Sequence, residues 1–207
     1  MVAPSKKTSI RRTEWEEVLH VIPAKSGIIS VVGADTRLGA HMIKHLSEAG
    51  KTVYGFSQEK DFKFSLKPIS IHEASNLGFP PHPILSDWLV VCIDPTIGFE
   101  DYTSKIRNLC QHLFFKKYSG DLLFFSSTEI CQPGEDGVIT DESLVAPRTE
   151  KGLNLATAEN ILNVMLYKLG NEVLPHVMRL EDSGIDKACA KAVEMMGLDF
   201  CPEMAVI

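Results

Sequence analysis

Two glycines, Gly33 and Gly39, stand between an apolar segment and an amphipathic one. The residues from Ile28 to Val32 are apolar or small and mostly β-branched, which is typical of a buried strand. After Gly33 the apolar period changes, and one helical face collects Leu38, Met42, Ile43, Leu46 and Ala49. Gly50 then stands where a glycine commonly ends a helix.

A second strand over Thr52–Ser57 completes a strand, helix, strand unit within about 30 residues. Consecutive strands joined by a helix pair in parallel, because the helix carries the chain back to the same end of the sheet. Further strands are predicted at Trp88–Ile93, Leu122–Phe125 and His176–Leu180, and further helices at Asp101–Lys117, Leu155–Leu169 and Gly184–Gly197. In the proline-rich segment 59–87 we expect one short strand and one short helix.

This alternation predicts an α/β fold, a single Rossmann-like doubly wound parallel sheet flanked by helices. We expect the domain to span residues 27–207 and to end in a short helix. An N-terminal arm, residues 1–26, precedes it and has the spacing of a capping box at Thr13 and Glu16, which predicts a short helix. The arm either packs on the domain or binds a partner.

Composition removes several classes of function. The chain has 207 residues, 44% hydrophobic and 23% charged, with a net charge of −6. An acidic chain does not favour nucleic-acid binding, and no apolar run is long enough to suggest a membrane span. Five cysteines form no CxxC pair, so we expect reduced thiols in a cytoplasmic protein. We expect no metal site, because His41 and His45 share a helix without a third ligand nearby in sequence.

The turn between strand and helix has the spacing Gly33, Thr36, Gly39. In a dinucleotide-binding turn the first glycine permits the tight bend, the second admits the pyrophosphate, and the third lets helix and strand pack closely. Thr36 occupies the second place. Its side chain fills space that a phosphate would use, although its hydroxyl is also able to donate to one. A turn with a purely structural role explains the same pattern.

With this turn, three more segments make the chain resemble the short-chain dehydrogenase/reductase superfamily, in particular its extended, nucleotide-sugar-epimerase-like branch. These segments are the strand Trp88–Ile93, the strand and serine motif Leu123–Ile130, and the stretch Pro147–Glu159. The resemblance covers roughly residues 27–180. It implies a Rossmann-like fold and a nicotinamide cofactor, NADP or NAD, bound at the carboxyl ends of the strands.

The chain departs from the family at the catalytic positions. The resemblance aligns the family's catalytic tyrosine with Lys151 and its lysine with Leu155. Only Ser127, or its neighbour Thr128, is then left as a candidate catalytic residue. A hydroxyl without a base in reach is a hydrogen-bond donor rather than an activated group. Asp94 and Pro95 stand where the family has small residues close to the cofactor. About 27 residues follow Leu180, too few for the family's substrate domain.

We predict the cofactor-binding residues from the turn and from the ends of the strands. The second strand ends without the acid that binds the ribose of NAD, and Arg37 is available for a 2′-phosphate, which favours NADP over NAD. The predicted set is Gly33, Asp35, Thr36, Arg37, Leu38, Gly39, Ser57, Ile93, Asp94, Pro95 and Ser126.

Three functional hypotheses follow. The first, which we favour, is a catalytically degenerate dehydrogenase or epimerase relative that acts by NADP-type nucleotide sensing or by protein binding. The second is an active but atypical NADP-dependent reductase or epimerase-like enzyme. The third is a structural partner subunit that binds no nucleotide. The resemblance also implies a homodimer, formed through the helices at Asp101–Lys117 and Leu155–Leu169; another protein partner is the alternative.

Overall fold

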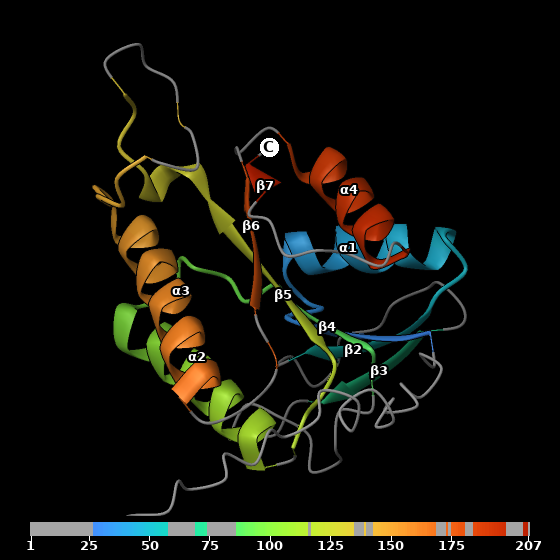
Figure 1. Cartoon of the computed structure of the whole chain (residues 1–207). Coiled ribbons are helices and arrows are strands. Elements are labelled where there is room, and N and C mark those ends of the chain that lie inside the picture. Colours follow the sequence, from blue (N-terminus) through green and yellow to red (C-terminus); the bar gives the residue numbers. More distant parts are fainter. Residues whose placement is uncertain are drawn as a thin grey trace, which may run out of the picture.

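A computed structural model describes residues 27–57, 69–73, 86–115, 117–134, 139, 143–168, 173, 175–180, 184–197 and 205–206. Within these residues one parallel sheet of seven strands has the order β3-β2-β1-β4-β5-β6-β7 (Figure 1). The strands are β1 (Ile28–Val32), β2 (Thr52–Ser57), β3 (Ile69–Glu73), β4 (Trp88–Val91), β5 (Asp121–Ser127), β6 (Pro175–Leu180) and β7 (Ala205–Val206).

Two pairs of helices cover the two faces of the sheet, as Figure 1 shows. On one face α1 (Arg37–Glu48) packs beside α4 (Ile185–Gly197), and on the other α2 (Phe99–Phe115) packs beside α3 (Glu150–Lys168). Alternate residues of the central strands point into two separate cores. Leu89 and Val91 of β4, for example, face α2 and α3, while Val90 faces the other way. None of the helices in the described part of the chain is long and apolar enough to cross a membrane.

The predicted Rossmann-like, doubly wound sheet is confirmed, and most element boundaries agree within two residues. The largest shift is at α3, which begins at Glu150 rather than at Leu155. The extra turn is capped by Thr149, whose hydroxyl accepts a hydrogen bond from the Gly152 amide at 2.9 Å. Because Gly152 and Asn154 are poor helix formers, the apolar period does not reveal this first turn.

The C-terminal end differs from the prediction of a final helix alone. β7 follows α4 and pairs in parallel with β6, with Met178 opposite Ala205. Two residues of strand carry no period, so β7 has no signal in the sequence. Pro175 is the first residue of β6, as its missing N–H requires. The predicted arm over residues 1–26 and the short helix expected within 59–87 lie outside the described residues.

A buried ion pair joins α3 to the sheet. Arg179 of β6 donates through Nη2 to Oε2 of Glu159 at 2.8 Å and through Nε to Oε1 at 3.2 Å. Both side chains are at most one tenth exposed. The planar guanidinium matches the carboxylate at two points, which fixes the rotation of α3 about its own axis against β6. The residues of α3 that face the strand ends are therefore held in place.

Candidate functional site

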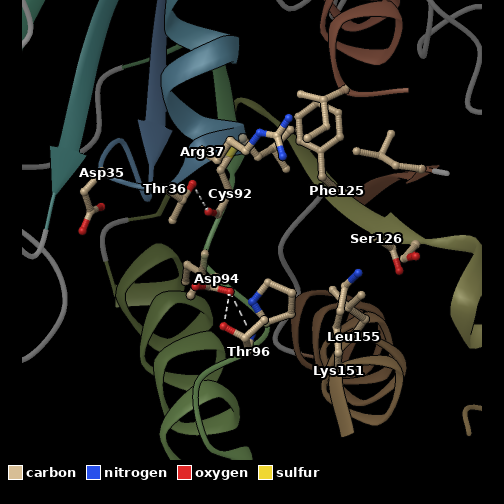
Figure 2. Close-up of a pocket in the computed structure, with 16 residues that line it drawn as sticks. Asp35, Thr36, Arg37, Cys92, Asp94, Thr96, Phe125, Ser126, Lys151 and Leu155 are labelled. Atoms are coloured by element: carbon tan, nitrogen blue, oxygen red, sulfur yellow. Dashed lines mark hydrogen bonds between the residues drawn. The ribbon is translucent and has the colours of Figure 1, made fainter. Parts of the chain in front are cut away.

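A cavity of about 510 Å³ lies at the carboxyl ends of the central strands (Figure 2). Its walls come from the segments that follow β1 and β4, from the ends of β5 and β6, and from the first turns of α1, α3 and α4. Ligands of open parallel sheets bind in this crevice, where the strand order reverses direction. Here the reversal lies between β1 and β4, since β2 and β3 extend to one side and β5, β6 and β7 to the other.

The turn after β1 needs both of its glycines. Gly33 has a φ of +84°, and a Cβ at this position would lie 2.5 Å from the carbonyl oxygen of Cys92. A Cβ on Gly39 would lie 2.0 Å from the carbonyl oxygen of Gly33. Gly33 therefore lets the turn pass close to β4, and Gly39 lets α1 pack against the turn. Both roles concern the backbone of the protein itself.

Thr36 fastens this turn through its hydroxyl. The oxygen accepts a hydrogen bond from the Gly39 amide at 3.0 Å, which makes Thr36 the N-cap of α1. The same Oγ1 lies 2.8 Å from two acceptors, the carbonyl oxygens of Gly33 and Cys92. A hydroxyl has one proton to donate. The Thr36 proton is thus directed at protein carbonyls, so in this arrangement the hydroxyl does not offer it to a ligand phosphate.

Arg37 and Asp35 line the cavity on either side of Thr36. In Figure 2 the Arg37 side chain extends toward Phe125 of β5, while Asp35 lies apart from it. Because β5 and β2 lie on opposite sides of β1 in the sheet, Arg37 extends away from the end of β2. The guanidinium therefore adds positive charge to the middle of the cavity.

The loop between β4 and α2 is held from within and from α3. Asp94 accepts hydrogen bonds through Oδ1 from the amide of Thr96 at 2.9 Å and from its hydroxyl at 2.8 Å. From α3, the fully buried Asn154 donates through Nδ2 to the carbonyl oxygens of Pro95 and Ile97 at 2.9 and 3.0 Å. Asp94 is exposed, so solvent screens the repulsion that its carboxylate would exert on a diphosphate.

Two serines end β5 at the side of the cavity that faces α3. Ser127 accepts a hydrogen bond from the Glu129 amide at 3.2 Å and caps the short 3₁₀ helix Thr128–Ile130. Ser126 is 4% exposed and lines the cavity, and its Oγ has no hydrogen-bond partner among the described residues. Of the two hydroxyls, that of Ser127 is hydrogen-bonded to the backbone, whereas that of Ser126 is not.

Lys151 and Leu155 lie one turn apart on α3 and both line the cavity. The Lys151 ammonium lies 3.0 Å from Oε2 of Glu129, and Leu155 is 3% exposed. No tyrosine is among the described residues that line the cavity. Tyr102 of α2 is buried, and desolvation first, and then the nearby Asp94 carboxylate, raise the pKa of its phenol well above the usual value.

The structure brings together most of the predicted binding residues. Eight of them line the cavity, as does Ser127: Asp35, Thr36, Arg37, Leu38, Ile93, Asp94, Pro95 and Ser126. Gly33 and Gly39 form the turn beside it. Ser57 is fully buried at the end of β2 and is not among the lining residues. Whether any of these residues binds a cofactor stays a prediction.

Sequence reasoning missed several residues of the cavity. Phe125, Leu180 and Ile185 are apolar residues at the ends of elements, where nothing distinguishes them from core residues. Asn154 affects the cavity indirectly, by holding the loop after β4, and Glu129 does so by pairing with Lys151. Only Asn154 gives a signal in the sequence, because an asparagine is unusual within an apolar helical pattern.

His41 and His45 of α1 share one acceptor on α4. Asp186, near the start of α4, accepts from Nδ1 of His41 at 2.8 Å and lies 3.4 Å from Nε2 of His45. These hydrogen bonds, the one from His41 first, lower the pKa of the Asp186 carboxyl. Among the described residues no group of three or more histidines, cysteines or acids is arranged to hold a metal ion. The three residues join α1 to α4.

Comparison with known proteins supports the fold. No protein-family model matches the chain, and no curated protein sequence does. Solved structures do match. UDP-N-acetylglucosamine 4-epimerase from Bacillus cereus has a TM-score of 0.69 and 15% identity over 87% of this chain and 77% of its own. dTDP-glucose 4,6-dehydratase from Bacillus anthracis, in complex with NAD, has a TM-score of 0.60 and 17% identity.

A UDP-galactose 4-epimerase also matches, with a TM-score of 0.58 and 17% identity. For this epimerase and the dehydratase the match covers 73% of the present chain but only 55% and 54% of theirs, so the chain spans about half the length of these two enzymes. The chain thus shares the fold of these two epimerases and of the dehydratase.

Proposed function

We propose that the protein binds a nucleotide of the NAD(P) type in the cavity and acts through that binding, as a sensor or as a scaffold. The observation that carries the proposal is the position of the cavity. It lies at the reversal point of the sheet, against the first turn of α1, whose leading amides and dipole favour an anion. Structures of the same fold, among them the dehydratase described above, contain NAD.

The proposal that the protein binds a nucleotide without catalysing hydride transfer rests on the residues of α3 and on the burial of Tyr102. A hydride-transfer enzyme of this fold would need a phenol at the cavity, but α3 presents an ammonium, Lys151, and an apolar side chain, Leu155, there. Tyr102 does not replace the phenol, because it is fully buried and is not among the residues that line the cavity, and desolvation raises its pKa further from neutral. An active, atypical reductase would have to use Ser127 or Lys151 as its acid.

Within this proposal the nucleotide is NADP rather than NAD. The end of β2 carries Ser57 and no acid, so it lacks the partner that the ribose of NAD would have. The only cation at the start of α1 is Arg37, which must turn away from Phe125 to reach a 2′-phosphate beside β2. Binding of both nucleotides with equal affinity would remove this preference while leaving the nucleotide site itself.

The test is to follow thermal unfolding while NADPH, NADH, NADP⁺ and NAD⁺ are titrated separately. A ligand at 100 times its dissociation constant stabilises the folded chain by about 2.7 kcal/mol. We expect NADPH and NADP⁺ to give the larger shifts and Arg37→Ala to reduce them. Lys44→Ala, which removes an exposed cation from the same helix, is the matched control and should change nothing. No shift with any of the four nucleotides overturns the proposal.

A partner subunit is the second candidate, and exposed apolar side chains favour it. Phe115 of α2 is 76% exposed and Tyr167 of α3 is 75% exposed, and Phe99, Phe114, Leu153 and Val164 on the same two helices are more than a third exposed. Large apolar patches on soluble proteins usually mark an interaction site. We propose that α2 and α3 contact a second copy of the chain or another protein. This role is compatible with nucleotide binding, since none of these six residues lines the cavity.

A further inference from the structure

Among the described residues, Lys151 is the one charged residue that α3 contributes to the lining of the cavity. The other charged lining residues, Asp35, Arg37 and Asp94, follow β1 and β4. Figure 2 shows the Lys151 side chain rising from α3 toward Ser126, on the side away from Asp35. An anion beside Lys151 is therefore attracted by the ammonium and lies away from the Asp35 carboxylate.

The Lys151 ammonium is accessible where it stands. Its side chain is 31% exposed, and the Glu129 carboxylate, 3.0 Å away, is 35% exposed. An exposed pair of this kind gains little from its mutual attraction, so it is a weak competitor for an incoming charge. Glu129 holds the ammonium beside the end of β5, because it lies in the 3₁₀ helix that Ser127 caps.

Ser126 adds a second polar group beside Lys151. The residue is 4% exposed, it lines the cavity, and its hydroxyl has no partner among the described residues. A buried hydroxyl without a hydrogen bond is costly, and native structures keep few of them unless water or a ligand satisfies them. The hydroxyl and the ammonium are thus two donors on one side of one cavity.

The remaining wall on this side is apolar. It is formed by Phe125, Leu155 and Leu180, from β5, α3 and β6. A bare inorganic anion would gain nothing from these side chains and would lose its hydration against them. An organic acid, in contrast, places its carboxylate at the donors and its carbon chain against the wall.

We infer that the α3 side of the cavity binds the carboxylate of a small organic acid, with Lys151 as its anchor and Ser126 as a second donor. We name this site, Ser126, Lys151, Phe125, Leu155 and Leu180, the acid subsite. It deepens the proposed function by giving the class of the second ligand. It does not require that a nucleotide be present, because none of its five residues belongs to the turn before α1.

The test compares acids with their neutral amides. Isovalerate and benzoate, and then isovaleramide and benzamide, are titrated into ¹⁵N-labelled protein at constant ionic strength, with and without NADPH. We expect at least one acid to bind at least tenfold more tightly than its amide and to shift the amide signals of Ser126, Ser127 and Lys151. Inorganic phosphate is titrated as the anion without a carbon chain and should bind more weakly than that acid.

Substitutions at the ion pair should act in opposite directions. Lys151→Met should abolish the tenfold preference for the acid, and Lys151→Arg should keep it. Glu129→Gln should tighten binding of the acid several-fold, because it removes the competing carboxylate. Lys44→Met is the control for loss of a surface ammonium and should have no effect. Unfolding curves show whether each variant is folded before its binding is measured.

Three results overturn the inference: equal binding of acid and amide, phosphate binding as tight as that of the acids, and unchanged acid binding in folded Lys151→Met. Absence of any binding by either acid overturns it as well. The nucleotide proposal fails on a different measurement, the NADPH titration. Acid binding without NADPH binding would therefore leave the acid subsite standing while removing the nucleotide.

Discussion

Gly39 has its role because it carries no side chain. A methyl group at this position would lie 2.0 Å from the carbonyl oxygen of Gly33, and that oxygen belongs to backbone that cannot move freely. We predict that Gly39→Ala lowers the free energy of unfolding by about 3 kcal/mol, at the upper end of overpacking costs. Urea denaturation measures this difference.

Gly98→Ala provides the control for that substitution. A Cβ on Gly98 meets no atom within 4 Å, so the stability should change by less than about 0.5 kcal/mol. If the two variants prove equally stable, the close packing of α1 on the turn is not the reason for the glycine at position 39.

Thr36 allows a second prediction at this scale. Thr36→Val keeps the shape of the side chain but removes the cap of the Gly39 amide and the one hydroxyl proton that is directed at the carbonyls of Gly33 and Cys92. We expect a loss of about 1–2 kcal/mol in thermal or urea unfolding. Thr36→Ser keeps the hydroxyl and should stay within about 0.5 kcal/mol of the native chain. A loss of the same size with serine would assign the effect to the methyl group instead.

The sequence places Thr36 at the second position of a three-glycine pattern, and this much could be predicted. The direction of its hydroxyl could not be. That direction depends on Cys92, which is 56 residues away in the chain and reaches Thr36 only because β4 pairs with β1. Local spacing does not contain such contacts.

The buried pair of Glu159 and Arg179 joins two elements and should be sensitive to substitution. Glu159→Gln removes the charge of a carboxylate that is bonded twice to a buried guanidinium, and we predict a loss of about 3–5 kcal/mol in urea denaturation. Replacing both residues by methionine should cost less than the single change, because the buried guanidinium is removed together with its carboxylate. A single variant as stable as the double variant would show that the pair is not desolvated.

The contact of α1 with α4 should depend on pH through Asp186. Its pKa is lowered in the folded chain by His41 and then His45. A lowered folded-state pKa stabilises the protein above the ordinary carboxyl value and loses that contribution as the pH falls through the folded value. We therefore predict that Asp186→Asn is less stable than the native chain at neutral pH and that the difference shrinks toward pH 3.

Unfolding measured at several pH values between 7 and 3 tests this prediction. Because Asp186 is exposed, salt should weaken the effect. A difference that is constant over the whole range would mean that the carboxylate charge has no part in the contact.

Elements with a clear apolar period could be predicted, and those without one could not. The helix α1 and the strand β2 agree with the sequence to within a residue. The first turn of α3 was missed because it depends on the cap at Thr149. Lys151 belongs to that turn: the resemblance places it at the family's catalytic tyrosine, but its helical position and its ion pair with Glu129 come from the structure.

For the molecule as a whole, the exposed apolar surface of α2 and α3 predicts self-association. Light scattering after size exclusion should give a mass near twice 22.9 kDa. Phe115→Lys combined with Tyr167→Lys should return the protein to a single chain, because two charges on this surface oppose its burial. Leu144→Lys, a substitution of an equally exposed residue outside the two helices, should leave the mass unchanged. A native protein with the mass of one chain contradicts the prediction.

The cavity is a property of the whole sheet and resists prediction for that reason. Its walls come from the ends of four strands and the starts of three helices, between Asp35 and Ile185. Residues after β1 and β4 could be predicted because they follow apolar strands directly. Leu180 and Ile185 reach the cavity only through the pairing of β6 with β5 and the packing of α4 beside α1.

The strand order has a consequence for synthesis on the ribosome. Among the described strands β1 is the earliest and lies inside the sheet, with β2 and then β3 on one side and β4 to β7 in sequence on the other. Each described strand after β1 therefore pairs with a strand that has already been made. None of these seven strands must wait for a later one, so the sheet can grow outward as the polypeptide leaves the tunnel.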